Sequence, residues 1–164
     1  MAWNDYIEGW KEPELLTDEE IELLLLDVSA RIPFKLIAQM EVDWEDTPEY
    51  KPICHDFVVT AVDRRNGNLF WAGGSQLQEQ GMDKGTMDVA PKNECFKPYL
   101  RSMDKMTHNE ENRYEILIEE LSLRPGKDSA TNLTDWLNKH MFDYRGLIEK
   151  GLAIEAPEGM YNFE

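Results

Sequence analysis

The chain changes its hydrophobic period abruptly at Pro33, and this change limits the folds it can adopt. Before it, apolar residues recur at the i, i+3, i+4 and i+7 spacing of one helical face, at Ile21, Leu24, Leu25 and Val28. After it, alternate residues from Phe34 to Trp44 are apolar, which is the pattern of a half-buried strand. Because proline disfavours helix at the residue before it, we expect the helix to end near Ile32. A strand should follow over residues 34–44.

Two capping boxes mark helix starts, Thr17 with Glu20 and Thr107 with Glu110. In the second helix, the apolar stripe at helical spacing is Tyr114, Leu117, Ile118 and Leu121, which we expect to face the core. This helix should stop at Arg124-Pro125-Gly126. We expect a further helix from near Asn132 and a short last helix that opens at Asp143-Tyr144-Arg145, with Gly151 at its C-terminal cap.

The middle of the chain carries strand signals. Residues 53–62 are rich in β-branched side chains and apolar on both faces, which predicts a central strand. Asn66-Gly67 suits a tight hairpin, with residues 69–72 as the returning strand. Residues 95–101 form a further short strand, which Pro98 places at a sheet edge because proline cannot donate a ladder hydrogen bond. The expected fold is α+β, a small, mostly antiparallel sheet with an N-terminal helix and two or three C-terminal helices.

A length of 164 residues suits one domain, which we place at residues 17–164. Residues 1–16 form an acidic arm that contains three large aromatic side chains, Trp3, Tyr6 and Trp10. Aromatic side chains have much apolar surface to bury, so we expect this arm to pack on the domain or on a partner. Residues 73–94 have four glycines and no sustained period, which predicts a long irregular loop, either a surface excursion or a partner-binding lid.

The charge is strongly negative and uneven. The net charge is −16, and residues 1–50 hold 14 acidic and 3 basic side chains. A protein of this charge is poorly suited to coating nucleic acid or to docking on anionic lipid. It attracts basic partners instead, although an acidic surface also serves solubility alone.

No chemical motif is strong. Cys54 and Cys95 lack the spacing of a zinc site, and we expect both to be reduced. Cys54 and His55 are neighbours on a strand and so point to opposite faces. His108 and His140 form no metal-ligand pair with a suitably spaced residue. No phosphate-binding glycine motif is present, so we expect no metal, no cofactor and no catalytic residue.

One cluster of polar residues falls on the predicted strand at residues 95–101. Lys97, Tyr99 and Arg101 alternate there, so they should share one exposed face opposite Phe96 and Leu100. Arginine binds carboxylates and phosphates bidentately, and tyrosine offers a flat stacking surface. The face could bind an anion, a peptide or a nucleotide, or it could pair with the acidic residues of the chain itself.

Three segments of the chain form a recognisable series: Asp27–Phe34, Lys97–Met103 and Phe142–Ile148, the last continued by Gly151–Pro157. In this order they resemble segments of small proteins without an established activity from gut Bacteroides-type bacteria and their phages. Those relatives commonly read ARLPYG at the first segment and KPYLRPMSSMT at the second, so Phe34 and Ser102 depart from the pattern. The resemblance implies a phage or prophage origin and an intracellular setting, and it carries no catalytic role.

These observations favour a non-enzymatic, acidic interaction protein that binds and occludes a macromolecular partner, with Trp3, Tyr6, Trp10, Lys97, Tyr99 and Arg101 as the candidate binding residues. The expected partner is a protein, and the acidic charge of the chain favours a basic one, with no direct contact to nucleic acid or membrane. No signal peptide precedes the domain, so we expect a cytoplasmic location. The alternatives are a nucleic-acid mimic that inhibits a host protein, a virion or assembly component, and a small enzyme built from carboxylates with His55 or His108.

Overall fold

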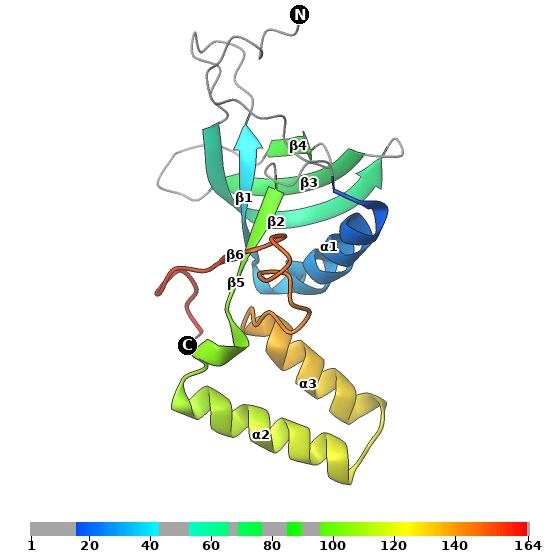
Figure 1. Cartoon of the computed structure of the whole chain (residues 1–164), viewed down its shortest axis with the longest axis vertical. Coiled ribbons are helices and arrows are strands. Elements are labelled where there is room, and N and C mark those ends of the chain that lie inside the picture. The colour runs from blue at the N-terminus through cyan, green and yellow to red at the C-terminus, as the bar shows by residue number, and fades with distance from the viewer. Residues whose placement is uncertain (1–15, 43–52, 66–68, 77–84, 90–95, 164) are drawn as a thin grey trace, which may run out of the picture.

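A computed structural model describes the backbone of residues 16–42, 53–65, 69–76, 85–89 and 96–163 (Figure 1). Side chains are described within residues 16–40, 56–62 and 96–163. The helices are α1 (Asp18–Arg31), α2 (His108–Leu123) and α3 (Lys127–Lys139), with 3-10 turns η2 (Ile32–Phe34) and η4 (Met103–Lys105). The strands are β1 (Ile37–Val42), β2 (Ile53–Arg65), β3 (Leu69–Gln76), β4 (Gly85–Val89), β5 (Phe96–Leu100) and β6 (Ile154–Glu155).

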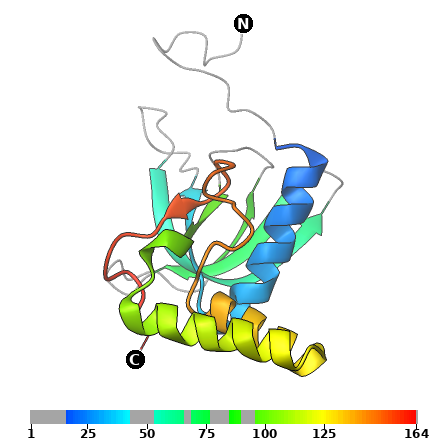
Figure 2. The same cartoon turned by 60° about the horizontal axis from the view of Figure 1, so that its bottom comes forward.

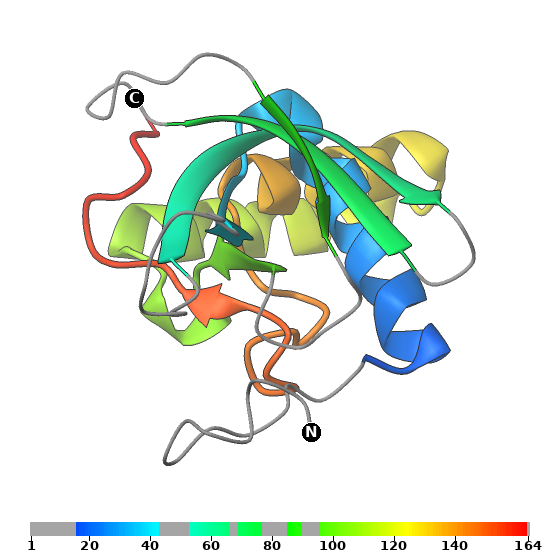
Figure 3. The same cartoon turned by 90° about the horizontal axis from the view of Figure 1, so that it is seen from above.

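The strands form one sheet in the order β4-β3-β2-β1-β5-β6. All neighbours in it are antiparallel except β5 and β6, which are parallel. The long strands β2 and β3 curve across the molecule, α1 packs against the sheet, and α2 and α3 form a hairpin at the far end (Figures 1 and 3). The predicted α+β class, with one N-terminal and two C-terminal helices, is confirmed.

The N-terminal helix follows the sequence pattern closely. Thr17 Oγ1 accepts a hydrogen bond from the Glu20 N–H, and the Glu20 carboxylate accepts one from the Thr17 N–H, which completes the predicted capping box. After α1, Pro33 lies in the 3-10 turn η2, and Lys35 takes a left-handed backbone conformation with φ of 62°. Because η2 and Lys35 occupy the residues directly after α1, β1 begins only at Ile37. The predicted start of this strand at Phe34 is therefore wrong.

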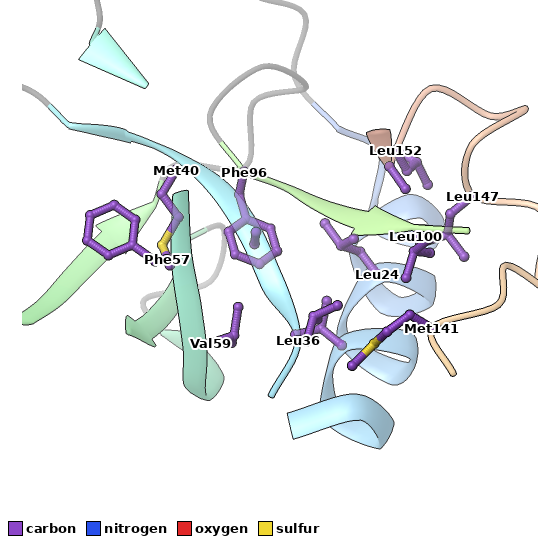
Figure 4. Packing of buried hydrophobic residues seen from close by; sticks show 13 residues of the cluster. Leu24, Leu36, Met40, Phe57, Val59, Phe96, Leu100, Met141, Leu147 and Leu152 are labelled. Carbon is purple, nitrogen blue, oxygen red and sulfur yellow. The ribbon is translucent and has the colours of Figure 1, made fainter. Parts of the chain in front are cut away.

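The core lies between α1, the sheet and the segment after α3 (Figure 4). Leu24 and Val28 of α1 share a buried cluster with Leu36, Ala38 and Met40, and all five side chains are at most 2% exposed. The alternation predicted from Phe34 onward therefore places Leu36, Ala38 and Met40 in the core, whereas Phe34 itself lies in η2 and is only partly buried. Further members come from β2, β5 and the C-terminal region: Phe57, Val59, Phe96, Leu100, Met141, Leu147, Leu152 and Ala153.

The prediction of one irregular loop over residues 73–94 is wrong in two places. Strand β3 continues through Gly73 and Gly74 to Gln76, and Gly85–Val89 forms β4. Gly73 and Gly74 lie between β2 and β4 in the ladder, so their backbone groups are paired on both sides. Backbone pairing of this kind does not require alternating apolar and polar side chains. The hydrophobic pattern of the sequence therefore did not indicate these strands.

Strand β5 is not at the sheet edge, contrary to the prediction from Pro98, because β6 pairs with it at Tyr99 and Leu100. The ladder between β1 and β5 stops at Ala38 opposite Pro98. Beyond that point the Tyr161 hydroxyl bridges the two strands. It accepts a hydrogen bond from the Ile37 N–H at 3.0 Å and donates one to the Tyr99 carbonyl at 2.8 Å.

Tyr161→Phe should lower the free energy of unfolding by about 1–2 kcal/mol, because it leaves the Ile37 N–H and the Tyr99 carbonyl without this partner. Burial raises the pKa of the Tyr161 hydroxyl well above its ordinary value, so the loss should not vary with pH near neutrality. Urea unfolding at several pH values measures it. Tyr114→Phe is the matched control, since no hydrogen bond of the Tyr114 hydroxyl occurs among the described residues. Equal stability of the two variants would contradict the bridging role.

The C-terminal half differs from the prediction in two respects. Helix α3 begins at Lys127, five residues before the predicted start near Asn132, directly after the Gly126 turn. The segment that opens at Asp143 is a series of turns and not the predicted helix. The Asp143 carboxylate accepts hydrogen bonds from the Leu147 and Ile148 N–H groups, and Gly151 takes the positive φ expected of it. These contacts replace the hydrogen bonds of a regular helix.

Candidate functional site

The aromatic arm cannot be placed, because Trp3, Tyr6 and Trp10 lie outside the described residues. The same holds for the side chains of Cys54, His55 and Cys95. The candidate residues that can be placed are therefore Lys97, Tyr99 and Arg101.

Lys97, Tyr99 and Arg101 do not form one exposed face. Tyr99 is only 8% exposed, and its hydroxyl donates a hydrogen bond to Asp56 Oδ1 at 2.8 Å. Lys97 is half-buried opposite Gln39 of β1. Arg101 lies beyond the end of β5. The prediction of an exposed stacking surface at Tyr99 is wrong, because this side chain is buried and its hydroxyl is hydrogen-bonded to Asp56.

Arg101 instead joins the start of α2 to the rest of the fold. Its Nη1 and Nη2 donate to the two carboxylate oxygens of Glu110, each at 2.8 Å. Its guanidinium lies between the rings of Phe142 and Phe163, 4.4 Å and 4.7 Å from their centres. Arg101 therefore pairs within the chain, which was one of the two alternatives for this cluster. Its acidic partner, Glu110, belongs to α2.

Glu110 has two tasks at this junction. Besides binding Arg101, its Oε1 accepts a hydrogen bond from the Thr107 N–H at 3.0 Å, as the predicted capping box requires. Burial alone would raise the pKa of Glu110, but the hydrogen bonds from Arg101 and Thr107 outweigh it and lower the pKa to about 2. The carboxylate is thus held ionised at the base of the helical hairpin.

A row of aromatic rings continues from this junction into the hairpin. Trp136 of α3 stacks with Tyr114 of α2 and with Phe142, at centre distances of 6.3 and 5.6 Å, and it contacts the tilted ring of His140 at 4.6 Å. His140 also stacks with Phe163, and its Nδ1 lies 2.9 Å from the Trp136 carbonyl. His140 is therefore a packed structural side chain, and the hairpin is fixed to the body by rings and by the Arg101–Glu110 pair.

The outer side of α2 is different, because it leaves large apolar side chains in solvent. Ile116, Ile118 and Leu123 are 45%, 41% and 73% exposed. Ile118 was expected to join the buried stripe of this helix, yet of the residues in α2 only Leu117 is buried. In Figures 1 and 2, α2 lies along the outer edge of the molecule, away from the sheet. No other described helix exposes so many large apolar side chains.

A shallow hollow of about 390 Å³ lies on this side of α2, lined by Tyr114, Glu115, Ile118, Glu119, Ser122 and Leu123. Four exposed glutamates accompany the apolar residues along the helix, at Glu111, Glu115, Glu119 and Glu120. The sequence did carry a signal for this surface. Ile116 and Leu123 lie off the i, i+3, i+4 stripe, so packing on α3 and the sheet cannot cover them together with Leu117.

A second hollow, of about 340 Å³, lies between η4 and the C-terminal segment. Its lining mixes cations and carboxylates, and Lys105 Nζ pairs with Glu155 Oε1 at 2.6 Å across it. In the described part of the chain, no three His, Cys, Asp or Glu side chains are grouped so that they could hold a metal ion.

Comparison with protein-family models, with curated proteins and with solved structures finds no match to this chain. None of the helices described here has the length and apolar character needed to cross a membrane. The site is therefore interpreted from its own geometry.

Proposed function

We propose that this protein is a non-enzymatic binding protein that contacts and occludes a macromolecular partner, and that the outer side of α2 is a contact surface. The observation that carries this proposal is the exposure of Ile116, Ile118 and Leu123 on one helix. Ile118 and Leu123 line the same hollow beside Glu115 and Glu119. Exposed apolar side chains bordered by charge in this way are typical of protein interaction sites. The acidic arm, which holds Trp3, Tyr6 and Trp10, remains a proposed second contact, in the phage-type host cytoplasm that the resemblance implies.

The way in which the hairpin is attached supports this proposal. The Arg101–Glu110 pair and the ring stack around Trp136 fix its inner side. A contact surface on a rigid element loses little conformational entropy on binding, so more of the contact energy appears as affinity. The proposed mechanism is steric. A partner bound to α2 would have its own contact surface blocked by the hairpin, and it would undergo no chemical change.

The test compares variants in affinity capture from a lysate of gut Bacteroides cells, read by mass spectrometry. Ile118→Ser/Leu123→Ser should lose a partner that the wild type retains, by about tenfold or more in recovered amount, because the central apolar contacts carry most of the affinity. Leu26→Ser is the matched control, since Leu26 is 59% exposed but lies on α1.

Recovery of the same proteins on the wild type and on the double variant would contradict α2 as a contact surface. Loss of a partner on Leu26→Ser alone would move the surface to α1. Circular dichroism of each variant confirms that the helices are intact.

A further inference from the structure

We propose that the hollow between η4 and the C-terminal segment binds a free α-amino acid with an apolar side chain. The charges on the two walls of this hollow, its apolar lining and its volume support the site. In Figures 1 and 2 the green η4 turn lies beside the red C-terminal segment, away from the outer side of α2. The site therefore does not depend on the proposed function.

The wall formed by η4 and the start of α2 supplies hydrogen-bond donors. Lys105, Ser102 and Thr107 line this wall. The Ser102 hydroxyl oxygen accepts a hydrogen bond from the Asp104 N–H. The Thr107 hydroxyl oxygen likewise accepts one from the Glu110 N–H, so the proton of each hydroxyl can be donated to a ligand. An ammonium group with two hydroxyl donors suits a carboxylate.

The wall formed by residues 155–159 supplies acceptors. Glu155 and Glu158 line it. Glu155 pairs with Lys105 across the hollow at 2.6 Å, whereas Glu158 forms no ion pair within the described part of the chain. The Lys105 and Glu155 side chains are 70% and 41% exposed, and a pair exposed to this degree contributes little to stability. A ligand can therefore separate the pair and place an ammonium group against this wall.

The two walls together favour a zwitterion over an ion of one sign. Arg101 also lines the hollow, but Glu110 already neutralises it. The hydrogen bond with Glu155 raises the pKa of Lys105, so this amine is charged near neutral pH. An anion alone would be repelled by Glu155 and Glu158, and a cation alone would be repelled by Lys105. An α-amino acid carries both charges close together, so its carboxylate and its ammonium group can each contact one wall.

The rest of the lining is suited to an apolar side chain of moderate size. Ala156, Pro157 and Phe163 contribute apolar surface, and the ring of Tyr161 lies beside them. The hollow has a volume of about 340 Å³, and pockets for small molecules start at about 300 Å³. Burial of an apolar side chain adds affinity that the exposed charges alone do not provide. Leucine is therefore a suitable probe.

The test titrates the full chain with leucine and follows the backbone amide signals by NMR. Leucine at up to about 10 mM should shift the amide signals of Ser102, Lys105 and Gly159 until they saturate, because a small ligand in an open hollow binds weakly. Leucinamide has no carboxylate, and N-acetylleucine has no ammonium group. Each should bind about tenfold or more weakly, since each leaves one wall without a partner. Glycine should also bind more weakly, because it has no apolar side chain.

Two variants assign the charges of the ligand to the two walls. Lys105→Ala should weaken leucine binding about tenfold or more without weakening leucinamide binding, because it removes the donor for the carboxylate and the charge that repels a cation. Glu155→Gln/Glu158→Gln should weaken both, because it removes the acceptors for the ammonium group. Lys150→Ala and Glu149→Gln change exposed positions outside the lining and should bind leucine like the wild type.

Equal binding of leucine and of either derivative would overturn the inference, and so would wild-type affinity for leucine in both charge variants. Leucinamide that binds more tightly than leucine would also overturn it, since the hollow would then bind a cation and not a zwitterion. None of these results bears on the outer side of α2, which the lysate capture with Ile118→Ser/Leu123→Ser tests separately.

Discussion

Asp27→Leu should destabilise the fold by about 3–5 kcal/mol, because it leaves a buried arginine without its counter-charge. Asp27 and Arg31 are both fully buried. The Asp27 carboxylate accepts hydrogen bonds from Arg31 Nε and Nη2 at 2.9 Å each and from Arg145 Nη1 at 2.8 Å. Urea unfolding at neutral pH measures the loss, and Asp135→Leu, at an exposed position of α3, should cost no more than about 0.5 kcal/mol.

A double variant separates the charge effect from the packing effect. Asp27→Leu/Arg31→Met removes both buried charges, so it should be less destabilised than Asp27→Leu alone. Part of the loss should remain, because the Phe142 carbonyl then loses the hydrogen bond from Arg31 Nη2, 2.7 Å long. A double variant that loses the sum of the two single effects would contradict the coupling of Asp27 and Arg31.

The local elements were predictable because their signals are local. Both capping boxes form, and three residues of the alternation predicted over residues 34–44, Leu36, Ala38 and Met40, lie in the core. Predictions failed where a distant segment supplies the hydrogen bonds. Gly73 and Gly74 pair within the sheet although no side-chain period marks them. Pro98 is in an inner strand because β6, more than fifty residues later, covers the far side.

Three segments far apart in the chain, residues 27–34, 97–103 and 142–148, contact one another in the fold. Arg31 of the first donates to the Phe142 carbonyl of the third, and Arg145 of the third binds Asp27 of the first. The backbone of Arg101, in the second, pairs with residues 141 and 143. These contacts give Arg31, Arg101 and Arg145 a structural role. Arg31 and Arg145 share Asp27 as a partner, and because Arg145 lies 118 residues away in the chain, no local spacing could indicate this contact.

The candidate contact surface was harder to predict, because a helical stripe looks the same whether the chain itself or a partner covers it. Ile118 was assigned to the core for this reason, yet 41% of it is exposed. Only the tertiary arrangement decides, since α2 packs on α3 and leaves its other sides in solvent (Figure 2). In the sequence, the indication of an exposed apolar surface was that Ile116 and Leu123 lie off the helical stripe.

Acidification should weaken the base of the hairpin through Glu110. The ordinary pKa of this group is 4.5, and in the fold it is about 2. A depressed pKa means that the stabilisation is fully present above about pH 4.5 and is lost as the pH falls toward 2. This lowering of the pKa corresponds to roughly 3 kcal/mol of folding stability. Because solvent reaches the rim of the Arg101–Glu110 pair, we expect a measured loss nearer to about 2 kcal/mol.

The measurement is the free energy of unfolding in urea between pH 7 and pH 2.5 for the wild type and for Glu110→Gln. Glutamine keeps the capping hydrogen bonds but not the charge, so the two proteins should differ at pH 7 and converge in acid. Glu149→Gln, at an exposed position, should follow the wild type throughout. If the difference in the free energy of unfolding between the two proteins stayed the same down to pH 2.5, the cause would be the shape of the side chain and not its charge. Because the same carboxylate caps α2 and binds Arg101, convergence would show that the charge of Glu110, and not the capping box alone, holds the hairpin to the sheet.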